Sequence, residues 1–302
     1  MMKKFSEELK KNFKNIYNNE GLSKYSWFNL GGPADIFFRP SSINQLSAFL
    51  KLLKNKNIPI NILGAGSNTL IRDGGIKGIA IKLGSKFSYL NLSDKNNIEA
   101  GAATLDKQLS NFASDNSISG LEFLSCIPGS VGGAIKMNSG CYGSEISKIL
   151  ISIVVLDSDG NKIEIPREEI NFFYRGCNLS DNFIILSAKF RGKINDKNKI
   201  KLKQAELIER KKNTQPNRVK TCGSTFKNPN NEKAWELIKK SKCDKMSVGE
   251  IRISEQHSNF FINNGKGTSH DIEELINKVR NEVLKVTGTN LELEIKIIGE
   301  KI

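Results

Sequence analysis

A glycine-rich segment, Pro128-Gly129-Ser130-Val131-Gly132-Gly133-Ala134, most restricts what this chain can fold into. Its glycines allow positive φ and let a ligand approach the backbone closely, so that backbone N–H groups can surround a phosphate. A flexible surface loop fits the segment poorly, because Val131, Ile135 and Met137 are apolar. We therefore interpret Pro128–Ala134 as a segment that holds a phosphate of a cofactor.

A second run of small residues, Gly64-Ala65-Gly66-Ser67-Asn68, follows the apolar segment 59–63, which is predicted to be a buried strand. The run begins like a dinucleotide-binding fingerprint, but Thr69 stands where the third glycine is required. A P-loop is also excluded, because Phe260 stands where a motif ending in Gly265-Lys266 requires its first glycine. The run can contact a phosphate through its N–H groups, and an ordinary tight turn fits it equally well.

Other segments carry groups suited to acid–base chemistry on a charged substrate. Ser224-Thr225-Phe226-Lys227-Asn228-Pro229 offers a hydroxyl, an ammonium group and an amide close together. Tyr174-Arg175 places a guanidinium among aromatic residues, where it requires an anionic partner, either a structural carboxylate or that of a substrate. Glu294 lies in an alternating segment, 291–298, and either faces solvent on a strand or serves as an acid in a cleft.

The composition limits the class of protein. A chain of 302 residues with 38% hydrophobic and 26% charged residues can form two globular domains with substantial cores. No apolar run is long enough to span a membrane, and residues 1–8 turn acidic too early for a signal peptide. We therefore expect a cytoplasmic protein with no membrane partner.

The net charge of +14 could indicate nucleic-acid binding. The lysines, however, are spread along the chain, and no basic tract is interleaved with aromatic residues. We expect no nucleic-acid partner and attribute the charge to compositional bias and to anionic small molecules. The scattered cysteines are expected to be reduced packing residues, and neither they nor the histidines form a metal-binding pattern; these residues are Cys126, Cys141, Cys177, Cys222, Cys243, His257 and His270.

Hydrophobic periodicity predicts helices and strands mixed without strict βαβ alternation, which indicates an α+β fold. Ser42 and Gln45 form a capping box for a helix that ends near residue 56, and Thr104 can cap another helix. Residues 192–199 are polar, weakly patterned and the candidate linker. Further helices are predicted over 6–17, 201–212, 231–240 and 271–286, and strands over 35–39, 59–63, 78–83, 98–101, 149–157, 162–165, 183–190, 259–262 and 291–298.

Taken in order, these motifs resemble those of the UDP-N-acetylenolpyruvoylglucosamine reductase family, flavoenzymes that make UDP-N-acetylmuramate for peptidoglycan. Each motif alone is weak, but their number, order and spacing over nearly the whole chain make the resemblance specific. The matching segments are Asn29–Asp35, Gly64–Leu70, Ile127–Ala134, Asn138 with Gly140, Tyr142 and Gly143, Tyr174-Arg175, Gln215-Pro216, Gly223–Pro229, His257–Phe260, Asn263–Gly265 and Leu291–Gly299.

The resemblance implies an FAD-binding domain of the vanillyl-alcohol-oxidase (PCMH) type in two lobes, followed by an α+β substrate domain. After a helical lead-in over residues 1–20, the FAD-binding domain would span 21–196, with lobes of about 21–83 and 84–196, and the substrate domain would span 197–302. The length matches the family's shorter form, which lacks a substrate-capping insertion. A monomer is expected.

The resemblance also implies the cofactors. FAD would be held by Gly64, Ala65, Gly66, Ser67 and Asn68 and by Pro128, Gly129, Ser130, Gly132, Gly133 and Ala134. Some relatives of this fold attach FAD through histidine, but both histidines here lie outside the FAD half, so non-covalent FAD is expected. NADPH would reduce the flavin, leave, and be replaced by the UDP-sugar substrate.

The resemblance assigns Arg175, Ser224 and Glu294 as the catalytic residues. The flavin would pass a hydride to C3 of the enolpyruvyl group, while Arg175 and Glu294 stabilise the enolate and Ser224 protonates C2. The reaction supplies cell-wall biogenesis, and through it cell shape and division. The expected substrate contacts are Tyr174, Lys227 and Asn228.

Three positions depart from the family's pattern. Lys296 stands where relatives carry arginine, and Cys126 and Cys141 stand where glycine or alanine is usual. These changes bear on flavin affinity rather than on the catalytic residues. The alternative functions are another PCMH-fold flavin oxidoreductase, acting on an alcohol or hydroxy acid, and a basic nucleic-acid-binding protein without flavin.

Overall fold

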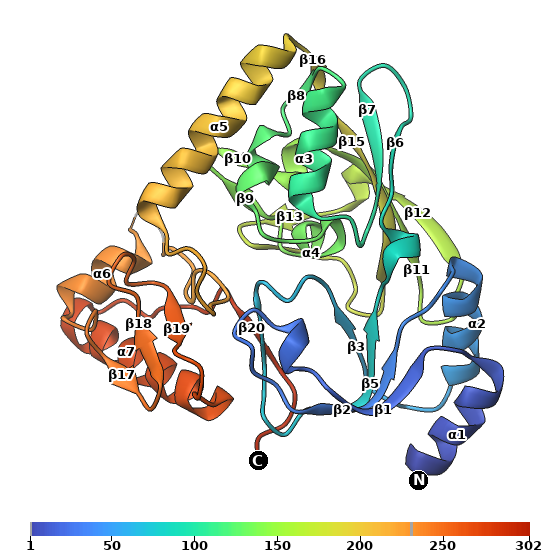
Figure 1. The fold of residues 1–302 in the computed structure, drawn as a ribbon, viewed down its shortest axis with the longest axis horizontal. Helices are drawn as coiled ribbons and strands as arrows, with labels where there is room; N and C mark the ends of the chain where they lie inside the picture. The colour runs from blue at the N-terminus through green and yellow to red at the C-terminus, as the bar shows by residue number, and fades with distance from the viewer. Residues whose placement is uncertain (1, 230–231) are drawn as a thin grey trace. The chain divides into compact units, whose positions relative to one another are not determined.

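The computed structural model describes residues 2–229 and 232–302, which form two compact units (Figure 1). Unit 1 comprises residues up to 17 together with 36–65 and 79–211, and unit 2 comprises residues 18–35, 66–78 and 212–302. Both units combine helices with mostly antiparallel strands, which confirms the α+β class predicted from the sequence.

Most helices and strands of both units are short, so packing between elements rather than helix length stabilises them. The α-helices are α1 (Met2–Asn12), α2 (Ile43–Leu53), α3 (Asp106–Asp115), α4 (Val131–Lys136), α5 (Lys197–Thr214), α6 (Ala234–Lys240) and α7 (Ser269–Thr287). The 3-10 helices are η1 (Ser23–Tyr25), η2 (Ser85–Phe87), η3 (Glu122–Cys126), η4 (Ile146–Lys148) and η5 (Arg167–Glu169). The strands are β1 (Ile16–Gly21), β2 (Pro33–Phe38), β3 (Ile60–Leu63), β4 (Thr69–Ile71), β5 (Ile76–Lys82), β6 (Leu90–Leu92), β7 (Asn97–Gly101), β8 (Ile118–Ser119), β9 (Gly140–Cys141), β10 (Ser144–Glu145), β11 (Leu150–Leu156), β12 (Lys162–Pro166), β13 (Phe172–Phe173), β14 (Gly176–Cys177), β15 (Ile184–Arg191), β16 (Lys193–Ile194), β17 (Ser247–Val248), β18 (Ile251–Ile253), β19 (Phe261–Asn263) and β20 (Lys296–Ile298).

One sheet has the strand order β1-β2-β5-β3, and within unit 1 β3 runs parallel to β5 with Ile60 opposite Ile79. Helices α1 and α2 cover this sheet (Figure 1). Phe38 of β2 and Phe49 of α2, both fully buried, stack with their ring centroids 4.1 Å apart. This contact joins the helix layer to the sheet in the first core of unit 1.

The second sheet of unit 1 has the order β12-β11-β15-β7-β6 and is antiparallel at each pairing. Helices α3 and α4 pack against it, with Leu109 and Ile135 in one core with Ile153 and Phe190 (Figure 1). Unit 1 therefore has two hydrophobic cores, one for each sheet. The glycine-rich segment Pro128–Ala134 leads into α4, beside the second core.

Unit 2 is built on the antiparallel sheet β17-β18-β19 and the helices α6 and α7. Its core includes Phe226 and Phe261, whose rings meet edge to face with centroids 6.0 Å apart. A separate parallel pair, β4 with β20, places Thr69 opposite Lys296. Segments that are far apart in the sequence therefore meet within this unit.

Helix α7 begins and ends at local signals that the sequence carries. The Thr268 side chain accepts from the backbone N–H of Asp271, and the Asp271 carboxylate accepts from that of Thr268, which completes a capping box. At the other end Gly288 adopts φ of 72°, the left-handed conformation that glycine favours. The predicted helix is therefore confirmed, with its start moved to Ser269.

The two predicted N-caps of unit 1 differ in outcome. The Ser42 side chain accepts from Gln45 N at 3.1 Å, as predicted, but the Gln45 side chain accepts from Ser41 N rather than completing the box. The Thr104 prediction is wrong, because its hydroxyl donates to Tyr89 O and accepts from Tyr89 N, both at 3.1 Å. Thr104 thus fixes a turn before β6 instead of starting α3.

Two predicted segment boundaries are wrong. The helix predicted over 6–17 ends at Asn12, because Asn15 has φ of 62° and the chain then enters β1. Residues 192–199 are not a linker: β16 pairs with β8 there, and α5 begins at Lys197. The Asp196 carboxylate accepts from Lys199 N at 2.9 Å, so the polar residues in this segment form a helix start.

Three predicted strands differ in extent or burial. β3 is less buried than predicted, with Ile60 and Ile62 37% and 38% exposed, because it lies at the edge of its sheet. Within 291–298 only β20 forms a ladder, and Leu293 makes an isolated bridge to Phe226. The strand predicted over 259–262 is observed as β19, which begins two residues later and ends one residue later. Of the helix predicted over 231–240, residue 231 lies outside the described residues, 232–233 are not helical, and α6 confirms 234–240.

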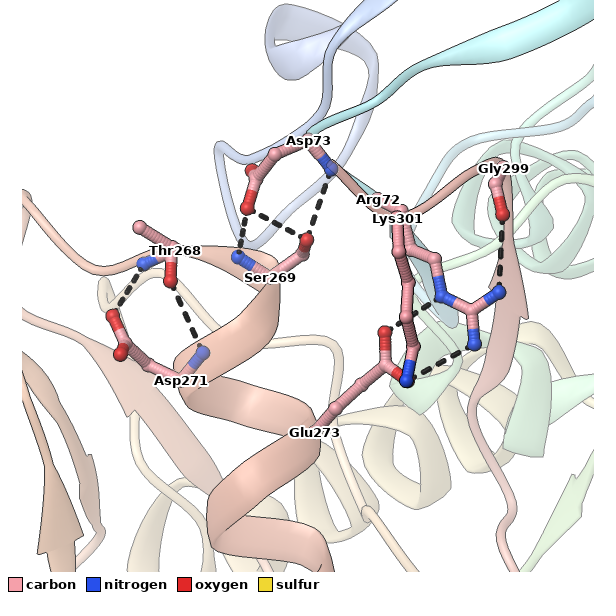
Figure 2. A network of polar contacts seen from close by, with 8 residues as sticks. All are labelled: Arg72, Asp73, Thr268, Ser269, Asp271, Glu273, Gly299 and Lys301. Atoms are coloured by element: carbon pink, nitrogen blue, oxygen red, sulfur yellow. Dashed lines mark hydrogen bonds and ion pairs between the residues drawn. The ribbon is translucent and has the colours of Figure 1, made fainter.

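A polar network ties the segment after β4 to the start of α7 within unit 2 (Figure 2). The Arg72 guanidinium donates to both carboxylate oxygens of Glu273, at 2.7 and 2.9 Å, and to Gly299 O at 3.1 Å. The Asp73 carboxylate accepts from the N–H and the hydroxyl of Ser269 at 2.8 and 2.7 Å. Bidentate pairing of this kind fixes orientation as well as distance, so the network sets how α7 meets residues 72–73.

We expect Glu273→Gln to lower the free energy of unfolding by about 1–3 kcal/mol at pH 7, the range for hydrogen bonds to charged groups. The Glu273 side chain is only 14% exposed, and hydrogen bonding to Arg72 lowers its pKa below the ordinary value. Denaturant unfolding measures the effect. Glu274→Gln on the same helix is the control: Glu274 is 41% exposed, and its pair with Lys278 should contribute less than about 0.5 kcal/mol.

The same pair predicts a pH dependence. Because the folded pKa of Glu273 is lowered, its stabilisation is present above the unfolded pKa of about 4.3 and is lost as pH falls through the folded value. The stability difference between wild type and Glu273→Gln should therefore shrink below about pH 4. A difference that stays constant down to pH 2 would show that the carboxylate charge is not what matters.

Candidate functional site

The two predicted phosphate-binding segments meet within unit 1. A Cβ atom added at Gly64 would lie 3.2 Å from Ser130 Oγ, and one added at Gly133 would lie 3.7 Å from the same atom. The first segment follows β3 and the second leads into α4. Small residues therefore leave the backbone of both segments uncovered where they approach one another, which fits a cofactor phosphate.

Neighbouring groups hold both segments in place. Lys82 Nζ donates to Gly64 O, and burial, followed by the charge of Arg39, lowers the pKa of this lysine. The backbone N–H groups of Val131 and Gly132 donate to carbonyl oxygens of residues 104 and 102, each at 2.9 Å. The first turn of α4 is therefore held in place by hydrogen bonds to the chain between β7 and α3, in addition to the bonds within α4.

Asp106 lies directly beneath the glycine-rich segment. Its side chain is fully buried, and both of its carboxylate oxygens lack a hydrogen-bond partner among the described residues. Burial raises the pKa of this carboxyl well above its ordinary value. A Cβ added at Gly129 would lie 2.5 Å from Asp106 Oδ2, so a larger residue there would have to displace the Asp106 carboxylate.

The rest of the first run, residues 66–68, belongs to unit 2. Gly66 has φ of 74°, and a Cβ atom there would lie 1.9 Å from Tyr25 O, so only glycine fits. Asn68 Nδ2 donates to Glu294 O at 3.0 Å, and Asn68 O accepts from Lys296 N at 2.9 Å. Asn68 therefore fixes the backbone from Glu294 to Lys296 through its side chain and its carbonyl oxygen. Its place in a glycine run did not predict this role.

Arg175 lies at the tip of the β13–β14 hairpin in unit 1 with φ of 60°, a left-handed conformation that is costly for a non-glycine residue. Its guanidinium carbon lies 4.7 Å from the centroid of the Tyr174 ring, and Tyr174 is 45% exposed. Asn138 supports the hairpin, because its Nδ2 donates to Phe173 O at 3.2 Å and its Oδ1 accepts from Ser147 N at 3.0 Å. Strain of this kind is typical of functional positions.

The Ser224 segment is held in unit 2 by a buried side chain. Asn259 accepts from Phe226 N at 2.9 Å and donates to Phe226 O at 2.8 Å. Thr225 N donates to Asn259 O at 2.8 Å, and Ser224 forms an isolated bridge with Phe260. The segment is therefore held by isolated bridges and side-chain bonds rather than by a strand ladder, with Ser224 half-buried.

Glu294 is brought next to this segment within unit 2. Its backbone N–H donates to Thr225 O at 2.9 Å, so Ser224 and Glu294 lie on neighbouring stretches of backbone. Lys227 Nζ lies 3.2 Å from Glu292 Oε2, and Asn228 Oδ1 accepts from the first N–H of α6, on Ala234, at 3.0 Å. Of the two predicted substrate contacts here, one already has an ionic partner and the other caps a helix.

The described residues offer neither a metal-binding cluster nor a membrane-spanning helix. No group of histidine, cysteine, aspartate or glutamate side chains there could hold a metal ion. None of the helices they form is both long and apolar enough to cross a membrane.

Comparison with known proteins agrees with this geometry. Residues 34–165 match the FAD binding domain family, and residues 215–298 match the C-terminal domain of UDP-N-acetylenolpyruvoylglucosamine reductase. The chain is 45% identical over 279 residues to the UDP-N-acetylenolpyruvoylglucosamine reductase of Wolbachia pipientis wMel, covering 92% of this chain and 94% of that protein. It is 43% identical over 300 residues to that of Pelagibacter ubique strain HTCC1062, covering 98% of each. The crystal structure of UDP-N-acetylenolpyruvylglucosamine reductase from Thermus caldophilus is similar, with a TM-score of 0.82 and 31% identity over 94% of this chain and 98% of that one.

The FAD-binding match and the paired glycine segments define the protein as an FAD-binding protein. The matches to named reductases make it an NADPH-dependent oxidoreductase. Identity above 40% over more than nine-tenths of the chain then gives the family. The chain belongs to the UDP-N-acetylenolpyruvoylglucosamine reductase family. The family, the PCMH-type fold with its C-terminal domain, and the cofactors FAD and NADPH that the sequence predicted are thereby confirmed.

We expect Gly66→Ala to lose more stability, and more bound FAD, than Gly143→Ala. Both glycines have positive φ, 74° and 85°, which costs an alanine about 1–2 kcal/mol. Only at Gly66 would the new methyl group also overlap backbone, whereas nothing lies within 4 Å at Gly143. Thermal unfolding and the flavin-to-protein absorbance ratio measure the difference, and equal losses would contradict the overlap.

We expect Arg175→Gly to be more stable than Arg175→Ala by about 1 kcal/mol, because only glycine tolerates φ of 60° without strain. Both variants lose the contact with Tyr174, so the comparison isolates the backbone term. Urea unfolding of the two variants measures it. Greater stability of the alanine variant would mean that the turn relaxes and stores no strain.

Proposed function

We propose that this chain uses NADPH to reduce UDP-N-acetylglucosamine enolpyruvate to UDP-N-acetylmuramate, a step of peptidoglycan precursor synthesis. Bound FAD would supply the hydride chemistry. The observation that supports the proposal is the hydrogen bond from Glu294 N to Thr225 O, which joins the stretches of backbone that carry Glu294 and Ser224. The two proposed catalytic residues of unit 2 therefore lie on neighbouring backbone segments.

Ser224 is the proposed proton donor to C2 of the substrate. A hydroxyl is a weak acid, so it can act only where its position is fixed and water is excluded. Ser224 meets the first condition, because the bridge to Phe260 and the bonds of Thr225 and Phe226 to Asn259 fix its backbone. Its partial burial favours the second.

Arg175 and Glu294 are proposed to stabilise the enolate that forms before protonation. The Arg175 guanidinium is permanently charged and can pair with the substrate carboxylate in two places. A carboxylate beside a forming enolate would repel it. Glu294 can therefore help only as a protonated acid that donates a hydrogen bond, or by holding a cation in position.

Tyr174, Lys227 and Asn228 are proposed to contact the substrate. Tyr174 is exposed beside Arg175, and Lys227 now pairs with Glu292, whose side chain is 73% exposed and can readily give up its partner. The Asn228 oxygen caps α6, so its amide nitrogen is the end that could donate to the substrate.

The cofactor segments Gly64–Asn68 and Pro128–Ala134 are proposed to hold FAD without a covalent bond. Both histidines, His257 and His270, lie in unit 2, whereas Gly64 and the whole of Pro128–Ala134 lie in unit 1. We further propose a cytoplasmic monomer, without a nucleic-acid partner, whose FAD-binding domain spans 21–196 and whose substrate domain spans 197–302.

We expect Ser224→Ala to leave anaerobic bleaching of the flavin by NADPH unchanged, because the serine acts only on the substrate. Reoxidation of the reduced flavin by UDP-N-acetylglucosamine enolpyruvate should slow by about 10²–10⁴-fold, the range for loss of a general acid. Stopped-flow absorbance measures both steps. Ser247→Ala, an exposed change in β17, is the control and should behave as wild type.

Three results would each change the proposal. Normal reoxidation in Ser224→Ala would remove Ser224 from the mechanism. A wild-type flavin that bleaches with NADPH but is not reoxidised by this substrate would redirect the proposal to another substrate of the same fold. Loss of NADPH bleaching in Ser224→Ala would mean that the serine supports the flavin rather than the substrate.

A further inference from the structure

Asp106, at the start of α3, is a fully buried carboxyl that makes no side-chain hydrogen bond within the described part of the chain. Its exposed fraction is 0%, and neither of its carboxylate oxygens has a partner there. No other described side chain carries two buried polar atoms without a partner. Because buried polar groups in native proteins are nearly always paired, this carboxyl requires an explanation.

The carboxyl lies against the backbone of the glycine-rich segment. Asp106 N donates to Gly129 O at 3.1 Å, and the preceding residue, Leu105, forms an antiparallel bridge with Ser130. A Cβ atom added at Gly129 would meet Asp106 Oδ2 before any other atom, so the carboxyl fills the space that a side chain at this position would need. The N–H of Ser130 has no acceptor among the described residues and is available to a phosphate. Asp106 therefore supports the backbone that is proposed to hold the FAD diphosphate.

A negative charge on Asp106 would be costly. A buried carboxylate needs a counter-ion or several hydrogen bonds, and Asp106 has neither among the described residues. The titratable groups on the elements beside it have other partners or face solvent; they are Lys107 and Asp115 of α3, Glu122 and Cys126 of η3, Lys136 of α4 and Lys211 of α5. Burial, with no opposing charge, raises the pKa of this carboxyl well above its ordinary value, which favours the protonated acid.

We propose that Asp106 is a positioning residue for the cofactor: it keeps its proton beneath the glycine-rich segment, and FAD binds tightly only to this neutral form. The inference rests on the proposed placement of the FAD diphosphate at Pro128–Ala134. A neutral acid fills the space beneath Gly129 without opposing a phosphate, whereas a carboxylate there would repel the diphosphate through a poorly screened interior. The bound cofactor and the Asp106 proton therefore stabilise one another.

This coupling fixes the direction of a pH effect. A bound diphosphate makes ionisation of Asp106 harder, so the carboxyl should have a higher pKa in the FAD complex than in the apoprotein. FAD affinity should be constant below the apoprotein value and fall by up to about tenfold per pH unit above it, until the value of the complex is reached. Lys82, which donates to Gly64 O and whose pKa burial lowers, can also weaken FAD binding at alkaline pH, so the test must separate the two groups.

Titration of the full-length apoprotein with FAD, followed by flavin fluorescence from neutral to alkaline pH, tests the coupling. Asp106→Asn has a similar shape but cannot ionise, so it should bind FAD as wild type does at neutral pH and lose less affinity as the pH rises. The ratio of the two dissociation constants removes the contribution of Lys82, which both proteins retain. Asp115→Asn, an exposed change on the same helix where Asp115 pairs with Lys197, is the matched control and should follow wild type.

Asp106→Leu is a second variant, apolar like the surrounding core, in case asparagine prevents folding, and it should lose the same pH dependence. Infrared absorption of the FAD-loaded proteins reads the charge state directly. Wild type at neutral pH should show the carbonyl band of a neutral carboxylic acid that Asp106→Leu lacks. Two results would each overturn the inference: no such band in wild type, or pH profiles of FAD affinity that are parallel in wild type and in whichever Asp106 variants fold.

Gly133→Val tests the placement of the cofactor separately. Gly133 is exposed, and a Cβ atom there would lie 3.7 Å from its nearest neighbour, so the fold can accept the larger side chain while the segment becomes covered. FAD affinity should fall at every pH. An unchanged affinity in Gly133→Val would contradict the placement of FAD at Pro128–Ala134, and the inference would fail with it. A lower affinity together with parallel Asp106 profiles would reject the role of Asp106 alone.

Discussion

The architecture of unit 2 depends on the two hydrogen bonds between the Asn259 side chain and the backbone of Phe226. A buried amide, which can both donate and accept, takes the place of a neighbouring strand and satisfies both polar groups of one residue. The segment that begins with Ser224 is thereby fixed without a full ladder on that side. Because Thr225 O in turn accepts the N–H of Glu294, one side chain positions two of the proposed catalytic residues.

Unit 1 carries backbone strain at the other proposed catalytic residue, Arg175. Arg175 and Tyr142 have φ of 60° and 52°, conformations that cost an L residue free energy and that glycine or asparagine would adopt more easily. Asn138, with φ of 41°, tolerates its conformation and uses both ends of its amide to tie the Arg175 hairpin to Ser147. The strain therefore persists because neighbouring bonds over-determine the turn, which gives the guanidinium a fixed position at some cost in stability.

The parts of the fold that the sequence predicted well are those with local causes. Helix α7 has a capping box, a periodic apolar face and a terminal glycine, all within its own sequence, and the prediction of 271–286 differs from Ser269–Thr287 by two residues at the start and one at the end. The errors arose where pairing between strands, rather than local sequence, determines the structure. Residues 192–199 were predicted to be a linker, but β16 within them pairs with β8. Ile60 was predicted to be buried, but β3 lies at the edge of its sheet. Leu9, Phe13 and Ile16, all within the helix predicted over 6–17, do share one core, but a strand supplies the last of them.

For the candidate site, too, the sequence predicted the features with local causes and missed those that depend on distant segments. The glycine segments could be recognised because close backbone approach requires small residues locally, whereas the roles of Arg175, Ser224 and Glu294 came only from resemblance. The sequence predicted Cys126 and Cys141 as packing thiols far apart in the chain. In the structure both pack in the second core of unit 1, and the Cys141 thiol donates to Phe123 O of η3, the element that Cys126 ends. Their spacing in the sequence could not predict this, because the turn of the chain between η3 and β9 depends on tertiary packing.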